Sequence, residues 1–296
     1  NYPSYNPNIF SLGMTVDEWE QIKKDKNNPM LNRATQGLYA PGSVFKIITA
    51  SAALDTDRFS SDAEFTDQGK YKVKGNIIRN YKGEVFNNHK FADALVHSIN
   101  TTFAKIGLKV GEETLRQYAV NFGFENEMKF SLPLSKSSIG NIKNEVDLAW
   151  TSLGQGEVVV TPLQITRVIS TIARNGKRTN PVILKKINSN AINKDTEERK
   201  IIDKKTTLVL KDILTRVVEE GTAKKAKMKE IKIAGKTGTA EIKDKIKNTH
   251  AWFAGFAPVK EPKEAIVVFL EQGGVGGKNA APVFKNIING GIQEYK

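Results

Sequence analysis

With 296 residues, of which 39% are hydrophobic, the chain is long and apolar enough to form one large domain or two modest ones, which excludes a disordered tail. It contains no cysteine, so disulfides and thiolate metal sites are excluded, and its histidines, His89, His97 and His250, are not spaced to share a metal ion. We expect neither a metal nor another cofactor. No run reaches the roughly 18 apolar residues of a membrane-spanning helix, and no signal-peptide pattern is present, so we expect this sequence to be soluble.

The formal charge of +13 is spread along the chain, with lysine clusters at positions 224–229 and 243–247. Such a charge favours anionic surroundings, which include nucleic acid and a phosphate-rich wall or membrane surface. No zinc-finger spacing, RNA-binding signature or basic zipper is present, so we expect no nucleic-acid partner. Solvated lysine-rich faces are the simplest explanation of the charge.

No internal repeat or low-complexity linker divides the chain, which predicts one compact unit with inserted subdomains. A helix is predicted to follow Pro41-Gly42-Ser43 and to run to about Leu54, with small residues that suit burial on most sides. A second helix is predicted from the cap Thr161 and Pro162 to Asn175-Gly176, with apolar residues on one face. The polar stretch 185–200 is predicted to be an exposed loop or hairpin.

The C-terminal third has a different pattern. An amphipathic helix is predicted from Thr206 to Glu219, ended by Gly221. Three short segments rich in β-branched and aromatic residues follow and predict an antiparallel sheet, and a last helix is predicted from Pro282 to about Gln293. The three predicted strands are Ile231–Ala240, His250–Pro258 and Glu264–Glu271.

The first candidate motif is Ser43-Val44-Phe45-Lys46, a Ser-x-x-Lys sequence at the start of a predicted helix. One helical turn places the lysine amine beside the serine hydroxyl, and no other serine of the chain has a lysine three positions after it. The helix N-terminus and a second lysine in the same cleft would favour the neutral amine, which a general base requires. Alone, the motif also fits an ordinary surface pair.

Two further motifs complete a set that suits acyl transfer to serine. Ser98-Ile99-Asn100 would add a hydroxyl and a carboxamide, although Ser4-Tyr5-Asn6 fits the same pattern and such residues commonly form caps or turns. Lys236-Thr237-Gly238-Thr239 lies on the first predicted strand, where it could bind a carboxylate beside an extended ligand. The backbone N–H groups of Thr239 and Ser43 could form an oxyanion hole.

In this order the three motifs resemble those of the penicillin-recognising serine enzymes, which include penicillin-binding proteins and serine β-lactamases. The resemblance to class B penicillin-binding proteins extends over nearly the whole chain. It includes the segments Tyr2–Asn8, Asn32–Ala34, Tyr39–Ser43, Leu153–Gly156, Thr161–Gln164, Gly221–Ala223 and Trp252–Pro258.

This resemblance implies an α/β (α+β) transpeptidase fold over residues 1–296, with an antiparallel sheet flanked by helices, a mostly helical subdomain, and the active site between them. It implies that Ser43 is the nucleophile, that Lys46 is its base and that Ser98 relays the proton. Asn100 would bind the donor amide, and Lys236 would steer Ser98 and the substrate carboxylate. Thr237 and Thr239 would complete the carboxylate site, and Gly238 would let the substrate lie against the strand. Gln155 and Trp252 would lie near the cleft, where packing roles are equally compatible with the sequence.

The resemblance also implies a setting. Peptidoglycan stem peptides would be the substrate and β-lactams the covalent inhibitors, at the extracytoplasmic face of a bacterial membrane, beside a membrane glycosyltransferase.

In this family the Tyr-Pro-Ser-Tyr stretch follows two strands of the central sheet, whereas here it begins at Tyr2. We therefore expect the sequence to lack those first strands, an N-terminal pedestal domain and a membrane anchor, leaving a sheet edge to be covered.

Three alternatives share the acylation chemistry. A β-lactamase needs a second base to activate water, and no glutamate between Ser98 and Lys236 has an asparagine four positions after it. A D,D-carboxypeptidase would use every residue named above, although the Leu153–Gly156 and Thr161–Gln164 segments resemble the transpeptidases more closely. A β-lactam-sensing or scaffold module would acylate without turnover.

Overall fold

The computed structural model describes residues 1–11, 13–184, 186–187, 190–191, 198–242 and 245–291. At its centre is a three-stranded antiparallel sheet in the order β11–β10–β9. Its strands are β9 (Ala234–Ile242), β10 (Lys245–Ala257) and β11 (Glu264–Leu270), which occupy the three segments predicted from β-branched and aromatic content.

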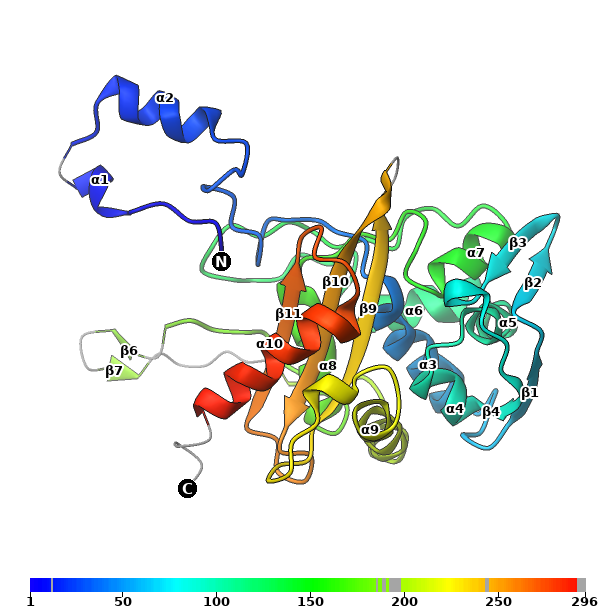
Figure 1. Cartoon of the computed structure of the whole chain (residues 1–296). Coiled ribbons are helices and arrows are strands. Elements are labelled where there is room, and N and C mark those ends of the chain that lie inside the picture. Colours follow the sequence, from blue (N-terminus) through cyan, green and yellow to red (C-terminus); the bar gives the residue numbers. More distant parts are fainter. Residues whose placement is uncertain (12, 185, 188–189, 192–197, 243–244, 292–296) are drawn as a thin grey trace.

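Helices cover the sheet, with α10 (Gly276–Gly291) on one face and α8 (Pro162–Ala173) on the other, while α9 (Lys204–Glu219) lies beside β9 (Figure 1). The α8 helix confirms its predicted start, because the Thr161 hydroxyl accepts a hydrogen bond from the N–H of Gln164 at 3.1 Å and Pro162 occupies the first helical position. The helix α9 also agrees with the prediction.

The last helix begins earlier than predicted. We expected Pro282 to be its first residue, because proline is favoured there, but α10 starts at Gly276 and contains Pro282. The start is set by contact with the sheet, where the N–H of Gly276 donates to the Thr239 hydroxyl at 3.2 Å. A tertiary contact therefore overrides the local proline signal.

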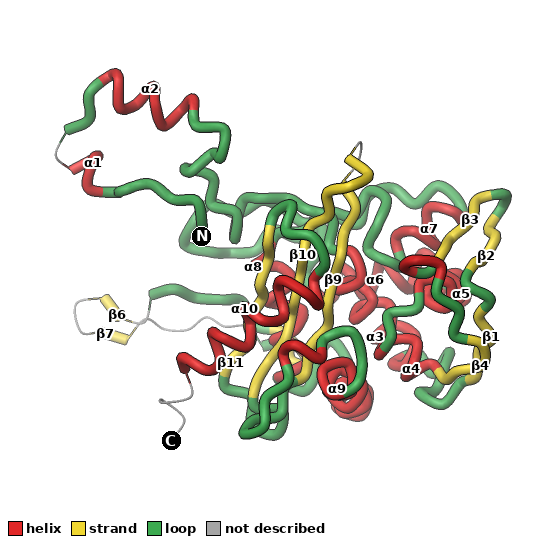
Figure 2. The backbone as a smooth tube through the Cα atoms, viewed as in Figure 1, coloured by secondary structure: helices red, strands yellow, loops and turns green. Residues whose placement is uncertain are grey.

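The second part of the molecule is mostly helical and lies beside the β9 edge of the sheet (Figures 1 and 2). Its central helix α3 (Lys46–Asp55) is buried at every residue from Lys46 to Leu54, as its small side chains predicted. The other helices are α4 (Phe91–Val96), α5 (Asn100–Val110), α6 (Glu112–Phe122) and α7 (Glu145–Thr151). Antiparallel pairs join β1 (Glu64–Asp67) to β4 (Asn87–Lys90) and β2 (Lys70–Val73) to β3 (Asn76–Arg79).

The remaining elements are short or peripheral. An N-terminal arm with α1 (Asn8–Ser11) and α2 (Val16–Lys24) extends away from the body (Figure 1). Within the predicted loop or hairpin at 185–200, β6 (Lys186–Ile187) pairs with β7 (Asn190–Ala191), and positions 185, 188–189 and 192–197 lie outside the described residues. The rest are β5 (Lys177–Arg178), β8 (Arg199–Lys200) and the 3₁₀ turns η1 (Gly42–Phe45), η2 (Tyr81–Gly83) and η3 (Lys224–Ala226).

An antiparallel sheet flanked by helices, with an adjoining helical part, is the α/β arrangement expected from the sequence. Among the described residues, none of the helices is both long and apolar enough to span a bilayer.

Candidate active site

Ser43 lies in the 3₁₀ turn η1, which leads directly into α3 at Lys46. The predicted helix therefore starts with a tighter turn, in which the N–H of Lys46 donates to the carbonyls of Ser43 and Val44. Ser43 is partly exposed, whereas Lys46 is completely buried. The turn thus presents the serine at the surface while its lysine partner points into the protein.

Gly42 fixes this turn against the sheet. Its φ of +54° favours glycine, and a Cβ at this position would lie 2.8 Å from the Thr239 carbonyl oxygen of β9. Its N–H also donates to the Gly154 carbonyl at 2.9 Å. The backbone before Ser43 is consequently held between β9 and the turn that follows α7.

Lys46 joins the first motif to the second. Its Nζ donates to the Ser98 carbonyl at 2.8 Å and to the Asn100 Oδ1 at 2.7 Å, and it lies 3.3 Å from the Ser98 Oγ. Burial, followed by the positive charge of Lys236, lowers the pKa of Lys46 well below its ordinary value. The sequence predicted a depressed pKa, but burial is the larger cause rather than the helix terminus or the second lysine.

The second motif forms the junction between α4 and α5. Ser98 has a left-handed backbone with φ +61°, which is uncommon for a residue other than glycine. Asn100 is the first residue of α5, and its Nδ2 donates to the Arg79 carbonyl at 3.0 Å. With the amide nitrogen held in this way, the amide oxygen of Asn100 faces Lys46.

The third motif lies on β9, where alternate residues face opposite sides of the sheet. Lys236 is completely buried, and this burial lowers its pKa to about 7. Its Nζ donates to the Thr237 carbonyl at 3.2 Å, while the steering of Ser98 by Lys236 stays a prediction. Gly238 shares the face of Lys236 and lies against η1, since a Cβ there would be 2.9 Å from the Pro41 carbonyl oxygen.

The two threonines of this motif point to the other face of β9. The Thr237 and Thr222 hydroxyl oxygens are 2.7 Å apart, and the Thr239 hydroxyl accepts from the N–H of Gly276. Sequence reasoning gave no role to Thr222 or Gly276. The only available signals were the Gly-Thr-Ala segment after α9 and the glycine pair at 276–277, and neither reveals a contact with a strand far away in sequence.

Gln155 and Trp252 occupy different surroundings. Gln155 is partly exposed and directly follows Gly154, which contacts the Gly42 backbone. Trp252 has no exposed surface, and its Nε1 donates to the Ala40 carbonyl at 3.1 Å. Burial of the indole does not support the expectation that Trp252 binds substrate, and its bond instead supports the segment that precedes Ser43.

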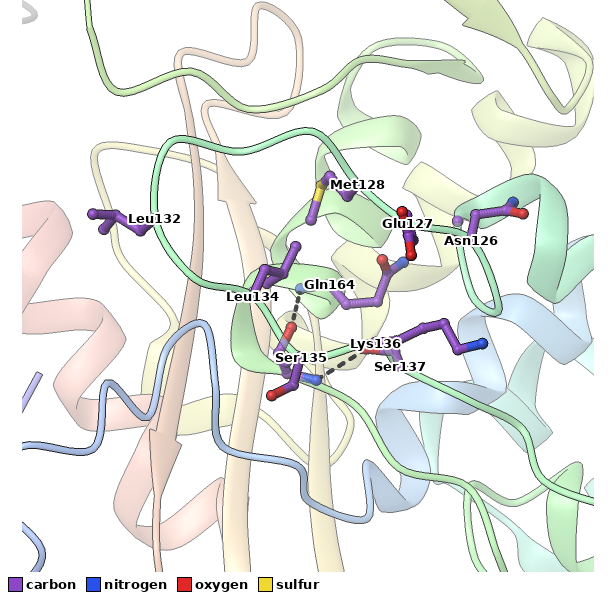
Figure 3. Close-up of a pocket in the computed structure, with 11 residues that line it drawn as sticks. Asn126, Glu127, Met128, Leu132, Leu134, Ser135, Lys136, Ser137 and Gln164 are labelled. Carbon is purple, nitrogen blue, oxygen red and sulfur yellow. Dashed lines mark hydrogen bonds between the residues drawn. The ribbon is translucent and has the colours of Figure 1, made fainter.

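A separate pocket of about 390 Å³ lies between the loop that follows α6 and the start of α8 (Figure 3). None of the predicted site residues lines it. Among the described residues, no group of three or more histidine, cysteine or acidic side chains is placed to hold a metal ion.

Comparison with known proteins agrees with this arrangement. A family model described as penicillin binding protein transpeptidase domain matches residues 1–289. The peptidoglycan D,D-transpeptidase PbpA of Mycolicibacterium smegmatis is 32% identical over 99% of this chain and 63% of its own length. Penicillin-binding protein 3 of Bacillus subtilis is 33% identical over 91% of this chain and 41% of its own length. The chain therefore spans less than two thirds of these curated relatives.

Solved structures are similar in fold over nearly the whole chain. The ceftriaxone acyl-enzyme complex of penicillin-binding protein A from M. tuberculosis has a TM-score of 0.91 at 29% identity, covering 98% of this chain and 69% of that one. The complex of PBP2 with MreC from Helicobacter pylori has a TM-score of 0.89 at 27% identity. The match covers 99% of this chain and 57% of that one. With its three motifs in this arrangement, the chain belongs to the penicillin binding protein transpeptidase domain family.

Proposed function

We propose that this chain is the catalytic domain of a serine D,D-transpeptidase that cross-links peptidoglycan stem peptides and is acylated by β-lactams. One observation carries the proposal. The buried amine of Lys46, one turn after the partly exposed Ser43, contacts both polar side chains of the Ser98-Ile99-Asn100 motif. A lysine with a lowered pKa one turn after a serine is the arrangement that nucleophilic acyl transfer requires.

In the proposed acylation, Ser43 Oγ attacks the carbonyl carbon between the last two D-alanines of a donor peptide. Its proton passes to the neutral amine of Lys46, and the negative charge on the carbonyl oxygen is stabilised by the backbone N–H groups of Ser43 and Thr239. Ser98 then relays a proton to the departing amine, which leaves as D-alanine. The product is an ester between Ser43 and the shortened donor peptide.

The second half of the reaction returns the serine. The amine of an acceptor peptide attacks the ester carbonyl carbon, its proton returns through the same groups to Ser43 Oγ, and a new peptide bond links the two stems. A β-lactam reacts in the first half by opening its ring, so that no leaving amine departs. Relatives captured as acyl-enzymes with β-lactams support this order of events.

The β9 strand supplies the proposed substrate-binding groups. It is an edge strand, paired only with β10 among the described residues, so an extended peptide can lie along its free side. Thr237 and Thr239 would hold the substrate carboxylate, and Lys236, which lies on the other face of the strand, would act on it through its charge. Gly238 would allow close approach, and Asn100 would bind the donor amide. Gln155 would border this cleft, whereas Trp252 would act by supporting the backbone before Ser43.

The proposal extends to the setting of the enzyme. We place it at the extracytoplasmic face of a bacterial membrane, where peptidoglycan is assembled, with the chain anchored in the complete protein. A membrane glycosyltransferase would supply the glycan strands that carry the stem peptides. One structural relative, PBP2 of H. pylori, has been solved in complex with another protein, MreC.

Intact-protein mass spectrometry after incubation with benzylpenicillin tests the proposed function. We expect one adduct per chain that persists for hours and maps to the peptide containing Ser43. Release of D-alanine from a stem-peptide donor should require an acceptor amine. Release of D-alanine with water as the only acceptor would indicate a D,D-carboxypeptidase. A stable adduct without release of D-alanine from donor peptides would indicate a sensor or scaffold. Rapid loss of the adduct would indicate a β-lactamase.

The lowered pKa values of Lys46 and Lys236 predict opposite effects of pH on the acylation rate. The rate should rise with pH as Lys46 loses its proton, because only the neutral amine can act as a base. It should fall above about pH 7 as Lys236 loses the charge that attracts the carboxylate. Fluorescent-penicillin labelling as a function of pH measures the two effects.

The Lys236→Arg variant is the control for the alkaline limb. Arginine keeps its charge over this pH range, so the fall above pH 7 should disappear in a variant that melts like the parent chain. A fall that is the same in both proteins would assign the alkaline limb to another group.

A further inference from the structure

We propose that Asp67, Asn80 and Thr101 form a buried positioning network that holds Asn100, and through Asn100 the amine of Lys46, in the geometry needed for acylation. This inference rests on the proposed function. The three residues lie outside the motifs, on β1, after β3 and on α5, and these elements lie beside one another at the helical end of the molecule (Figure 1).

Asp67 is the centre of the network. The residue is 1% exposed, and its carboxylate accepts four hydrogen bonds. Oδ1 accepts from the Thr101 hydroxyl at 2.5 Å and from the Gly69 N–H at 3.0 Å, while Oδ2 accepts from the Asn80 Nδ2 at 2.8 Å and the Phe86 N–H at 2.9 Å. Burial alone would raise its pKa, but these bonds outweigh burial and lower it, so the buried group is a carboxylate.

Asn80 and Thr101 connect the carboxylate to the second motif. The Oδ1 of Asn80 accepts from the Thr101 N–H at 3.1 Å, so Thr101 is held through both its backbone and its side chain. Thr101 directly follows Asn100, and Asn80 directly follows Arg79, whose carbonyl accepts from the Asn100 Nδ2. The backbone of Asn100 is therefore held through Thr101, and the carbonyl that its side chain contacts is held through Asn80. Both Thr101 and Asn80 are hydrogen-bonded to Asp67.

The position of Asn100 in turn determines that of the Lys46 amine, the proposed base. Asn100 Oδ1 accepts the shortest of the three hydrogen bonds made by the Lys46 amine, at 2.7 Å. A small displacement at the start of α5 would move this acceptor, and misplacement of a reacting group by about 1 Å costs on the order of 100-fold in rate. Asp67, Asn80 and Thr101 touch no reacting atom in this scheme and act only through Asn100.

Neighbouring threonines on α5 provide a matched test. Thr101→Val removes the hydroxyl that bonds to Asp67 with little change of shape, and Thr101→Ser restores it. Thr102→Val is the control, because Thr102 is also fully buried and its hydroxyl lies 2.9 Å from the His89 Nε2, away from the network. The measurement is the acylation rate constant of benzylpenicillin, separated from its reversible binding by stopped flow, together with the melting temperature of each variant.

We expect Thr101→Val to slow the acylation step about tenfold or more, while Thr101→Ser and Thr102→Val stay within about threefold of the parent chain. Equal rates for Thr101→Val and Thr102→Val at matched stability would overturn the inference. If Thr101→Val does not fold, Asn80→Ala cuts the same link from the other side and carries the same expectation. A parent chain that forms no adduct would instead refute the proposed function.

Discussion

Replacing Ser43 by alanine is expected to abolish covalent labelling by penicillin and all transpeptidation, because the substitution removes the attacking oxygen. Folding should be preserved. Ser43 is partly exposed, and no hydrogen bond of its hydroxyl occurs among the described residues, so the free energy of unfolding should change by no more than about 0.5 kcal/mol. Mass spectrometry of the incubated variant, with a thermal melt on the same sample, measures both effects.

Ser4→Ala is the matched control for this experiment. Ser4 belongs to a Ser-x-Asn sequence like that of Ser98, but it lies exposed in the N-terminal arm, so its loss should leave labelling unchanged. Persistent labelling of Ser43→Ala would show that another serine is the nucleophile.

Replacing Lys46 by alanine is expected to slow acylation by about 10²- to 10⁴-fold, the range for loss of a general base. The nucleophile would remain, but no neutral amine would be present to take its proton. The second-order rate constant for benzylpenicillin, measured over hours at high inhibitor concentration, tests this prediction.

Lys46→Met separates chemistry from packing. Methionine fills much of the same buried volume without an amine, so its acylation should be as slow as that of the alanine variant. Its free energy of unfolding should fall by about 1–3 kcal/mol, because the Ser98 carbonyl and the Asn100 Oδ1 lose their hydrogen-bond donor. Acylation at the parental rate in either variant would remove Lys46 from the mechanism.

Local sequence signals predicted those parts of the fold that depend on local physics. The cap at Thr161 and proline at position 162 located the start of α8, and a high content of β-branched and aromatic residues located the three strands. The predicted start of α10 was wrong because the true start depends on the contact between Gly276 and Thr239, which no local pattern reveals. The 3₁₀ turn before α3 was missed for the same reason, since the Gly42 backbone is fixed by β9.

The site shows the same division. Motif spacing and family resemblance predicted the residues that Lys46 contacts on the second motif, and the structure brings these together. Asp67 and Asn80 escaped notice because an aspartate and an asparagine among polar residues are ordinary turn formers. Only the folded chain shows that Asp67 is buried and bonded to the start of α5.

The close contact between Gly42 and the Thr239 carbonyl has a further consequence, because these residues lie far apart in the sequence. The nucleophile and the strand that would bind the substrate can meet only after residue 239 has been made and the long loop between residues 42 and 239 has closed. A nascent or partly folded chain therefore has no assembled catalytic centre. Covalent labelling by penicillin thus reports completed folding, and the labelled fraction of a preparation counts its native molecules.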